Sequence, residues 1–189
     1  RIRKIALNHP DGDRTILERM EKSDFDFTYL EVPDGMRALA PSKLNSVGGA
    51  LAFLSMKDVR SESALNFDPT EATVTRFETW DGVAVTVSTI DVDGEKWARF
   101  HAEFNESLVF EKISVPEPSA GESDEEGGET VDPYAAERGE VSKISARTQG
   151  WAYVLDDNKM DQLRRRSEDF IEADVPDDEE GTGDLRTNE

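Results

Sequence analysis

The residues of this chain that could do chemistry are few and widely spaced. Asp91, Asp93 and Glu95 surround Gly94 and resemble the opening of a calcium-binding loop, in which oxygen ligands alternate before a glycine. The twelfth position of such a loop needs an acid, and here it is Ala102. The sequence therefore favours a hairpin turn at Asp93-Gly94 over a calcium site.

The two histidines, His9 and His101, lie in different halves of the chain. His101 falls among aromatic residues on an expected strand and could act as a general base if an acid converged on it. No suitably spaced partner marks a catalytic triad or a metal cluster, and nothing singles out one carboxylate pair. The sequence contains no nucleotide-binding or hydrolase motif. We therefore predict no catalytic residue, no cofactor and no metal, with a hydrolase as the least favoured function.

Two other groups of residues could form binding surfaces. Trp80, Trp97 and Trp151 could line a groove for a glycan or a peptide, although tryptophans on strands usually fill cores. The run from Arg164 to Arg166 could dock anionic headgroups or an acidic partner. The favoured interpretation of this run is helix support, through ion pairs at helical spacing with three neighbouring acids, Asp161, Glu168 and Asp169.

Charge limits the classes of partner. The chain has 189 residues and a net charge of −20, with ten acids within 111–140 and ten within 168–189. This charge argues against a nucleic-acid partner and against broad contact with an anionic membrane, because both surfaces are negative. It is compatible with basic partners or with salt adaptation. The absence of cysteine excludes disulfides and thiolate metal sites.

The first half of the chain predicts three strands and a helix. Strands are expected over 2–8 and 15–20, joined by a turn at Asp11-Gly12, and over 25–29, where three aromatics alternate with polar residues. A helix is expected to begin at Pro41, with one apolar stripe formed by Leu44, Val47, Leu51 and Leu54. The pair Gly48-Gly49 weakens this helix and suggests the close approach of another backbone.

The second half repeats this order. Strands are expected over 72–79 and 83–89 around a type I′ turn at Asp81-Gly82, and then over 96–104. A helix over 134–148 and a strand over 151–155 follow. The last helix should be capped by Asp156 or Asp157, and its buried stripe should contain four residues, Met160, Leu163, Ser167 and Phe170.

These elements predict an α+β fold with a mostly antiparallel sheet, built from two β-β-β-α pseudo-repeats with helices packed on the sheet. The pseudo-repeats span about 2–59 and 72–171 of a single domain over 1–172. An acidic insert is expected over about 115–131, and an acidic, disordered tail over 173–189. Each copy is too small to bury its own apolar face, so we expect both halves to share one core.

Several segments resemble the bacterial domain-of-unknown-function family 4340. The likeness spans most of 2–172 and is carried by the opening Ile2–Leu7, the turn Leu65–Pro69, the strand Ala72–Thr75, the strand Gly150–Leu155 and the segment Leu163–Phe170. The resemblance implies an envelope protein on the periplasmic side, usually held by an N-terminal membrane helix. It also implies association with a transporter of the ATP-binding-cassette type, of the sort linked to gliding motility.

The leading hypothesis is therefore a non-enzymatic, extracytoplasmic interaction module with a membrane-protein or envelope-protein partner. The chain begins at Arg1 and enters a strand at once, so we expect an excised fragment whose membrane contact lies in a segment outside it. The alternative is a glycan- or peptide-binding domain that uses the tryptophan groove. The sequence does not specify the oligomeric state.

Overall fold

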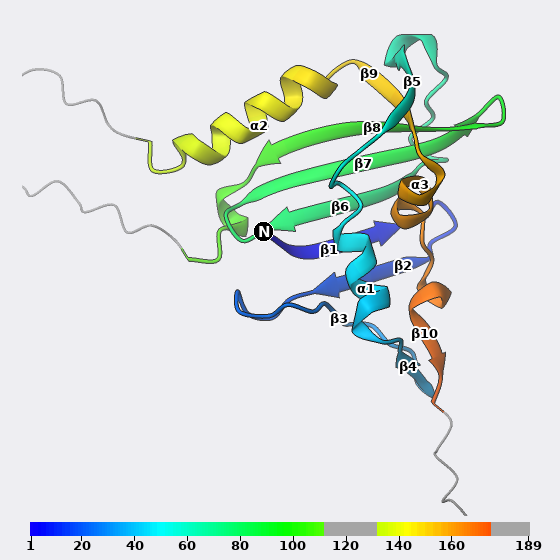
Figure 1. The fold of residues 1–189 in the computed structure, drawn as a ribbon, viewed down its shortest axis with the longest axis vertical. Coiled ribbons are helices and arrows are strands. Elements are labelled where there is room, and N and C mark those ends of the chain that lie inside the picture. The colour runs from blue at the N-terminus through cyan, green and yellow to red at the C-terminus, as the bar shows by residue number, and fades with distance from the viewer. Residues whose placement is uncertain (112–131, 175–189) are drawn as a thin grey trace, which may run out of the picture.

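A computed structural model describes residues 1–111 and 132–174. In these ranges an eight-stranded antiparallel sheet has the strand order β3-β2-β1-β6-β7-β8-β9-β5 (Figure 1). Its strands are β1 (Ile2–Asn8), β2 (Arg14–Glu18), β3 (Thr28–Tyr29), β5 (Met56–Ser61), β6 (Thr73–Thr79), β7 (Val83–Val92), β8 (Glu95–Phe104) and β9 (Trp151–Leu155). A second sheet pairs β4 (Met36–Ala38) with β10 (Ile171–Ala173). The α+β class and the antiparallel sheet are confirmed.

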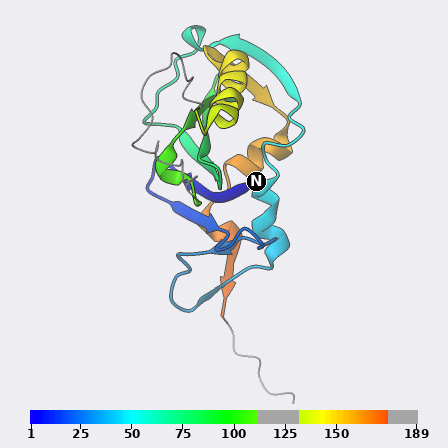
Figure 2. The same cartoon turned by 90° about the vertical axis from the view of Figure 1, so that its left-hand side faces the viewer.

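Three α-helices and three 3₁₀-helices accompany the sheets in the described ranges. They are α1 (Pro41–Gly48), α2 (Ala135–Thr148), α3 (Asp157–Leu163), η1 (Glu62–Ala64), η2 (Glu106–Leu108) and η3 (Ser167–Phe170). The views in Figures 1 and 2 place α1 and α3 on the same face of the sheet, whereas α2 runs alongside β8. Only Trp97 to Arg99 of β8 pair with β9, so α2 lies beside the part of β8 that has no strand partner on that side.

The main core lies between the sheet and the two helices α1 and α3. It joins side chains from both halves of the chain, among them Ile5, Leu7, Phe77, Val47, Leu163 and Phe170. A smaller cluster around Trp97 and Ile90 covers the opposite face. The expectation that the closing unit shares one apolar interior with the first strands is confirmed.

The two halves meet where β1 pairs with β6 in the middle of the sheet. On each side of this junction three antiparallel strands follow in sequence, β1 to β3 and β6 to β8. The strands differ greatly in length, since β3 spans two residues and β8 spans ten. The strand order alone therefore does not establish the predicted repeats.

The first helix is shorter than expected. It ends at Gly48 with Gly49 as its C-cap, so Leu51 and Leu54 follow the helix and are only partly buried. A Cβ atom placed on Gly48 would lie 2.8 Å from Cε2 of Phe27. The close approach expected at this glycine pair is thus made by an aromatic side chain and not by a backbone.

The expected aromatic strand over 25–29 is mostly absent. Only Thr28 and Tyr29 pair with β2, because the N–H of Phe27 donates to Oδ1 of Asn45 in α1 at 3.0 Å. Phe27 and Tyr29 are buried, but the side chain of Phe25 is 83% exposed and lies against the Arg1 guanidinium. The prediction that all three aromatics face the core is wrong for Phe25.

The type I′ turn predicted at Asp81-Gly82 is found instead at Asp93-Gly94. The hairpin between β7 and β8 has positive φ at both Asp93 (53°) and Gly94 (83°), as a type I′ turn requires. At Asp81-Gly82 only the glycine has a positive φ, of 85°, so the type I′ prediction there is wrong.

The acidic insert predicted over 115–131 lies outside the described residues, as does the predicted tail from 175 onward. Strand β10 extends to Ala173, where a tail was expected to have begun, and Ala173 pairs with Met36 of β4. The final helix also ends before Ser167, which begins the separate helix η3.

Replacing Leu163 by alanine should lower the free energy of unfolding by about 2–5 kcal/mol, because its fully buried side chain would leave a cavity. Leu51→Ala should cost less, since Leu51 is only partly buried. Urea denaturation of both variants measures this difference. Equal costs would contradict the placement of Leu163 in the shared core.

Candidate functional site

The three consecutive arginines connect the end of α3 to segments far away in the sequence. Nη2 of Arg164 lies 2.6 Å from Oδ2 of Asp91 in β7. Arg166 forms ion pairs with Asp11 and Asp13 in the turn between β1 and β2. Nη1 of Arg165 donates to the carbonyl of Lys43 and to Oγ of Ser46, both in α1.

The predicted pairing of these arginines along their own helix is wrong. Helix α3 ends at Leu163, with Arg164 as its C-cap, so no helical spacing relates the arginine side chains to Glu168 or Asp169. Asp169 instead accepts the backbone N–H of Arg166 and caps η3. Asp161 lies 3.6 Å from Nζ of Lys96.

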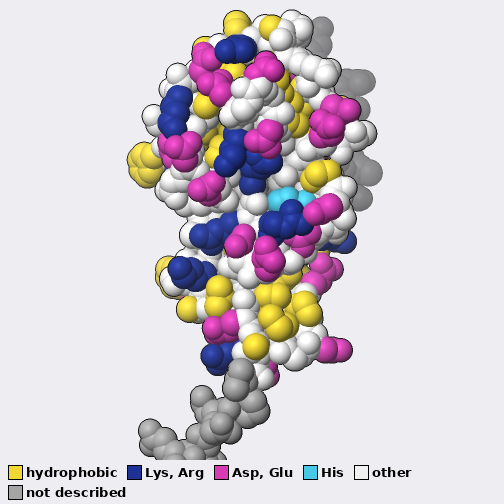
Figure 3. Space-filling view, turned by 90° about the vertical axis from the view of Figure 1, so that its right-hand side faces the viewer, with side chains coloured by type: hydrophobic (Ala, Val, Ile, Leu, Met, Phe, Trp, Pro, Cys, Tyr) yellow, Lys and Arg dark blue, Asp and Glu magenta, His cyan; other side chains and the backbone are white. Residues whose placement is uncertain are grey.

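A hollow of about 650 Å³ opens beside the arginine run, and we call it the basic hollow. Five cationic side chains line it, together with three aspartates: Lys43, Lys96, Arg164, Arg165 and Arg166, with Asp91, Asp161 and Asp169. Figure 3 shows lysine and arginine side chains gathered in the middle of this face, interspersed with acidic ones.

The arginines change the acidity of their partners. The hydrogen bond from Arg164 holds the pKa of Asp91 below its ordinary value. The backbone N–H of Asp13 and the Arg166 guanidinium lower the pKa of Asp11 in the same direction. Burial pushes the pKa of Asp13 upward, but hydrogen bonds from Ser167 and the charge of Arg166 outweigh it, so this pKa is also lowered.

A second, apolar groove of about 450 Å³ lies between α2 and the segment after α1. Leu51, Leu54 and Met56 form one wall, and Ile144 of α2 and Tyr153 of β9 contribute to the other. The hydroxyl of Tyr153 donates to the carbonyl of Arg147 at 2.7 Å and ties α2 to the sheet.

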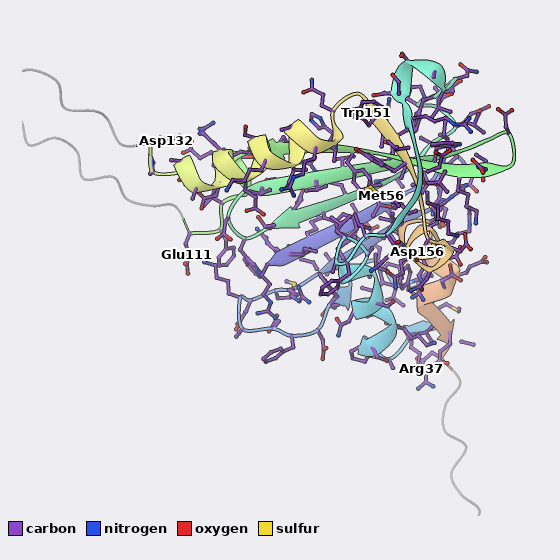
Figure 4. The ribbon with its side chains drawn as sticks, turned by 45° about the horizontal axis from the view of Figure 1, so that its top comes forward. Arg37, Met56, Glu111, Asp132, Trp151 and Asp156 are labelled. Atoms are coloured by element: carbon purple, nitrogen blue, oxygen red, sulfur yellow. The ribbon has the colours of Figure 1, made fainter. Side chains whose placement is uncertain are left out.

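The stretch of chain that forms one wall of this groove, and strand β5 after it, also carry apolar side chains that the fold does not bury. Phe53 is 98% exposed and has a φ of 52°, and Met56 and Val59 on β5 are about half exposed. Strand β5 is the last strand of the sheet, and five of its six residues are exposed. In Figure 4, Met56 lies at the start of this strand.

The sequence did not identify this surface, because the apolar spacing placed Leu51 and Leu54 on the same helix as Leu44. The pair Gly48-Gly49 was the available signal: a helix that stops there leaves Phe53 in a connecting segment.

The three tryptophans do not form a common groove. Trp80 is 2% exposed and packs edge-on against Phe110, and Trp97 is 1% exposed and lies under the Arg60 guanidinium. Trp151, at the start of β9 in Figure 4, is 47% exposed. A groove needs at least two exposed indoles, so the glycan-binding or peptide-binding alternative lacks its site.

The two histidines lie in different environments. The ring of His9 connects Thr73 with the carbonyl of Arg165, through Nδ1 at 3.2 Å and Nε2 at 2.9 Å. His101 is exposed, and its Nε2 lies 4.0 Å from Oε2 of Glu103. Within 1–111 and 132–174, no group of three or more potential ligands could hold a metal ion. No helix in those ranges is long and apolar enough to cross a membrane.

Comparisons with family models, with curated proteins and with solved structures found no match for this chain.

The free energy of unfolding should fall as the pH drops below about 4, because the unfolded chain then binds more protons than the folded chain. The stabilisation from Asp11, Asp13 and Asp91 is present above their ordinary pKa and is lost as the pH falls through the lowered values. Urea denaturation over a pH series measures the slope. Arg164→Gln should flatten it, whereas Arg37→Gln, which breaks an exposed pair with Glu172, should not. An unchanged slope in Arg164→Gln would contradict this.

Acrylamide should quench only part of the tryptophan fluorescence, because two of the three indoles are buried. The change Trp151→Phe should remove most of the quenchable component and leave the remaining emission nearly unaffected by acrylamide. A large quenchable component that survives in Trp151→Phe would show that Trp80 or Trp97 is accessible.

Proposed function

We propose that this chain is a non-enzymatic interaction module that binds an extended, apolar segment of a partner protein. The segment lies along β5 and places a side chain in the apolar groove, with Phe53, which precedes the groove residue Leu54 in the chain, as the exposed aromatic contact. The conformation and exposure of Phe53 are the single observation that carries this proposal.

Phe53 is unfavourable for the isolated fold in two ways. A positive φ costs a residue with a Cβ atom about 1–2 kcal/mol, and Asn or Gly would avoid most of that cost. The exposed ring also gains nothing from burial. Strained backbone and unburied aromatics recur at functional sites, and aromatic side chains are frequent anchors in protein interfaces.

Strand β5 supports an extended partner segment. An edge strand offers unpaired backbone N–H and C=O groups, and added strands bind to them through main-chain hydrogen bonds. Met56 begins β5 and also lines the groove, so a segment on this edge reaches the apolar pocket. Lys57, Asp58 and Arg60 on β5 keep the free edge from pairing indiscriminately.

Net charge favours a basic partner. At −20 the chain attracts proteins rich in lysine and arginine over long distances, which raises the rate of encounter. From the resemblance to family 4340 we propose that the module acts on the periplasmic side of a bacterial envelope, beside a transporter of the ATP-binding-cassette type.

We further propose that residues 2–59 and 72–171 are two copies of one unit, the first built on β1 to β3 and the second on β6 to β8. The antiparallel pairing of β1 with β6 supports this, because it places the two three-strand groups side by side around one junction.

Phe53→Asn should weaken partner binding about 30-fold, the usual effect of removing an interface anchor worth about 2 kcal/mol. Folding stability should stay the same or rise, since Asn accepts a positive φ more readily. Peptides selected by phage display on the wild-type chain serve as ligands, and titration calorimetry gives both affinities. Hydrogen exchange should show added protection of the β5 amides on binding.

Phe25→Asn is the matched control, because Phe25 is also an exposed phenylalanine but lies in the segment before β3. Equal losses of affinity in both variants, or selected peptides that protect no β5 amide, would refute binding at Phe53 and β5. Affinity capture with the full-length protein that recovers no transporter or envelope component would refute the proposed location beside an envelope transporter.

A further inference from the structure

We propose that the basic hollow is a binding site for a phosphate group. This site is separate from the apolar groove and does not depend on the proposed partner. Its ligand is a phosphate carried by a small molecule or by a lipid headgroup, and the two sources share the same chemistry.

The cations of the hollow come from three separate stretches of the chain. Lys43 belongs to α1, Lys96 to β8, and the three arginines follow α3. They meet in one place although the chain carries 42 acids against 22 bases. Concentrated positive charge on so acidic a protein attracts a small anion locally.

Two of these cations are not neutralised by the fold. Arg164, Lys96 and Arg166 each have an aspartate partner. In the described part of the chain, Lys43 and Arg165 form no ion pair with a carboxylate, and Arg165 donates only through Nη1, to α1. The ring of Phe170 lies 5.7 Å below the Arg165 guanidinium, which helps to hold its plane in position.

Arg164 adds a further positive charge to the lining of the hollow. Its Nη2 is bonded to Asp91, and its buried Nη1 has no hydrogen-bond partner among the described residues. The planar guanidinium matches the spacing of phosphate oxygens, which makes arginine a frequent phosphate ligand.

The aspartates that line the hollow limit how long an anionic ligand can be. Asp91 and Asp161 are well exposed and would repel an extended polyanion such as an acidic peptide or a nucleic acid. A single compact phosphate can bind beside Lys43 and Arg165 while the aspartates keep their own partners. The arrangement therefore favours one phosphate group over a long acidic chain.

The test compares thermal unfolding in sodium phosphate with that in sodium chloride at matched ionic strength. Phosphate should raise the melting temperature of the wild-type chain, because a ligand that binds only the folded state stabilises it. Lys43→Ala should weaken phosphate binding about tenfold, as expected for the loss of one charge-assisted contact. The Lys43 amine has no bond in the described structure, so this variant should fold normally.

Arg165→Gln should have a similar effect, and Lys143→Ala is the matched control because Lys143 lines the apolar groove instead. No stabilisation by phosphate in the wild type, or stabilisation that persists in both hollow variants, would overturn the proposal. Stabilisation by a glutamate-rich peptide but not by phosphate would overturn it in favour of an acidic partner.

Two arms separate the sources of the phosphate. Glycerol 3-phosphate represents a soluble ligand, and phosphatidylcholine vesicles with and without phosphatidylglycerol represent a headgroup. Binding in either arm that is lost in Lys43→Ala supports the site and identifies its source. Binding in neither arm would overturn the proposal.

Discussion

The packing of the segment after β9 against the first strands is the constraint on which the rest of the structure depends. Leu163 and Phe170 complete a core that begins with Ile5 and Leu7, more than 150 residues earlier. The hydroxyl of Thr75 in the middle of β6 donates to the carbonyl of Leu163 at 2.6 Å, and so satisfies a buried acceptor at the end of α3. This contact fixes the start of the arginine run against the middle of the sheet.

Electrostatics follows from this packing. A chain of charge −20 repels itself when compact, and its few arginines are therefore most useful where they bridge distant acids. Arg164 reaches β7 and Arg166 reaches the β1–β2 turn, so two residues of one short run connect the closing segment to both halves of the sheet. The same run places Arg165, which has no carboxylate partner among the described residues, on the lining of the basic hollow. The run from Arg164 to Arg166 thus both connects distant segments through ion pairs and lines a site for an anion.

The surface that we propose for a protein partner consists of apolar side chains and a strand edge that folding leaves exposed. Gly48 lies too close to Phe27 to tolerate a Cβ atom, and α1 stops there. The chain then continues toward β5 in a connection that exposes Phe53 and opens the apolar groove against α2. Among the residues that the structure describes, no further strand pairs with the outer edge of β5.

Local pattern predicted the strands β1, β2, β6, β7, β8 and β9, the cap at Asp156 and the burial of Leu163, because alternation and helical spacing report which face of an element is apolar. The sequence also predicted the α+β class and the shared core. It did not predict where α1 ends, the exposure of Phe25, or the partners of the arginines. Each of these depends on atoms distant in sequence: Phe27 against Gly48, Asn45 bonded to the Phe27 N–H, Asp91 beside Arg164. Periodicity carries no information about such contacts, so only the tertiary structure could decide them.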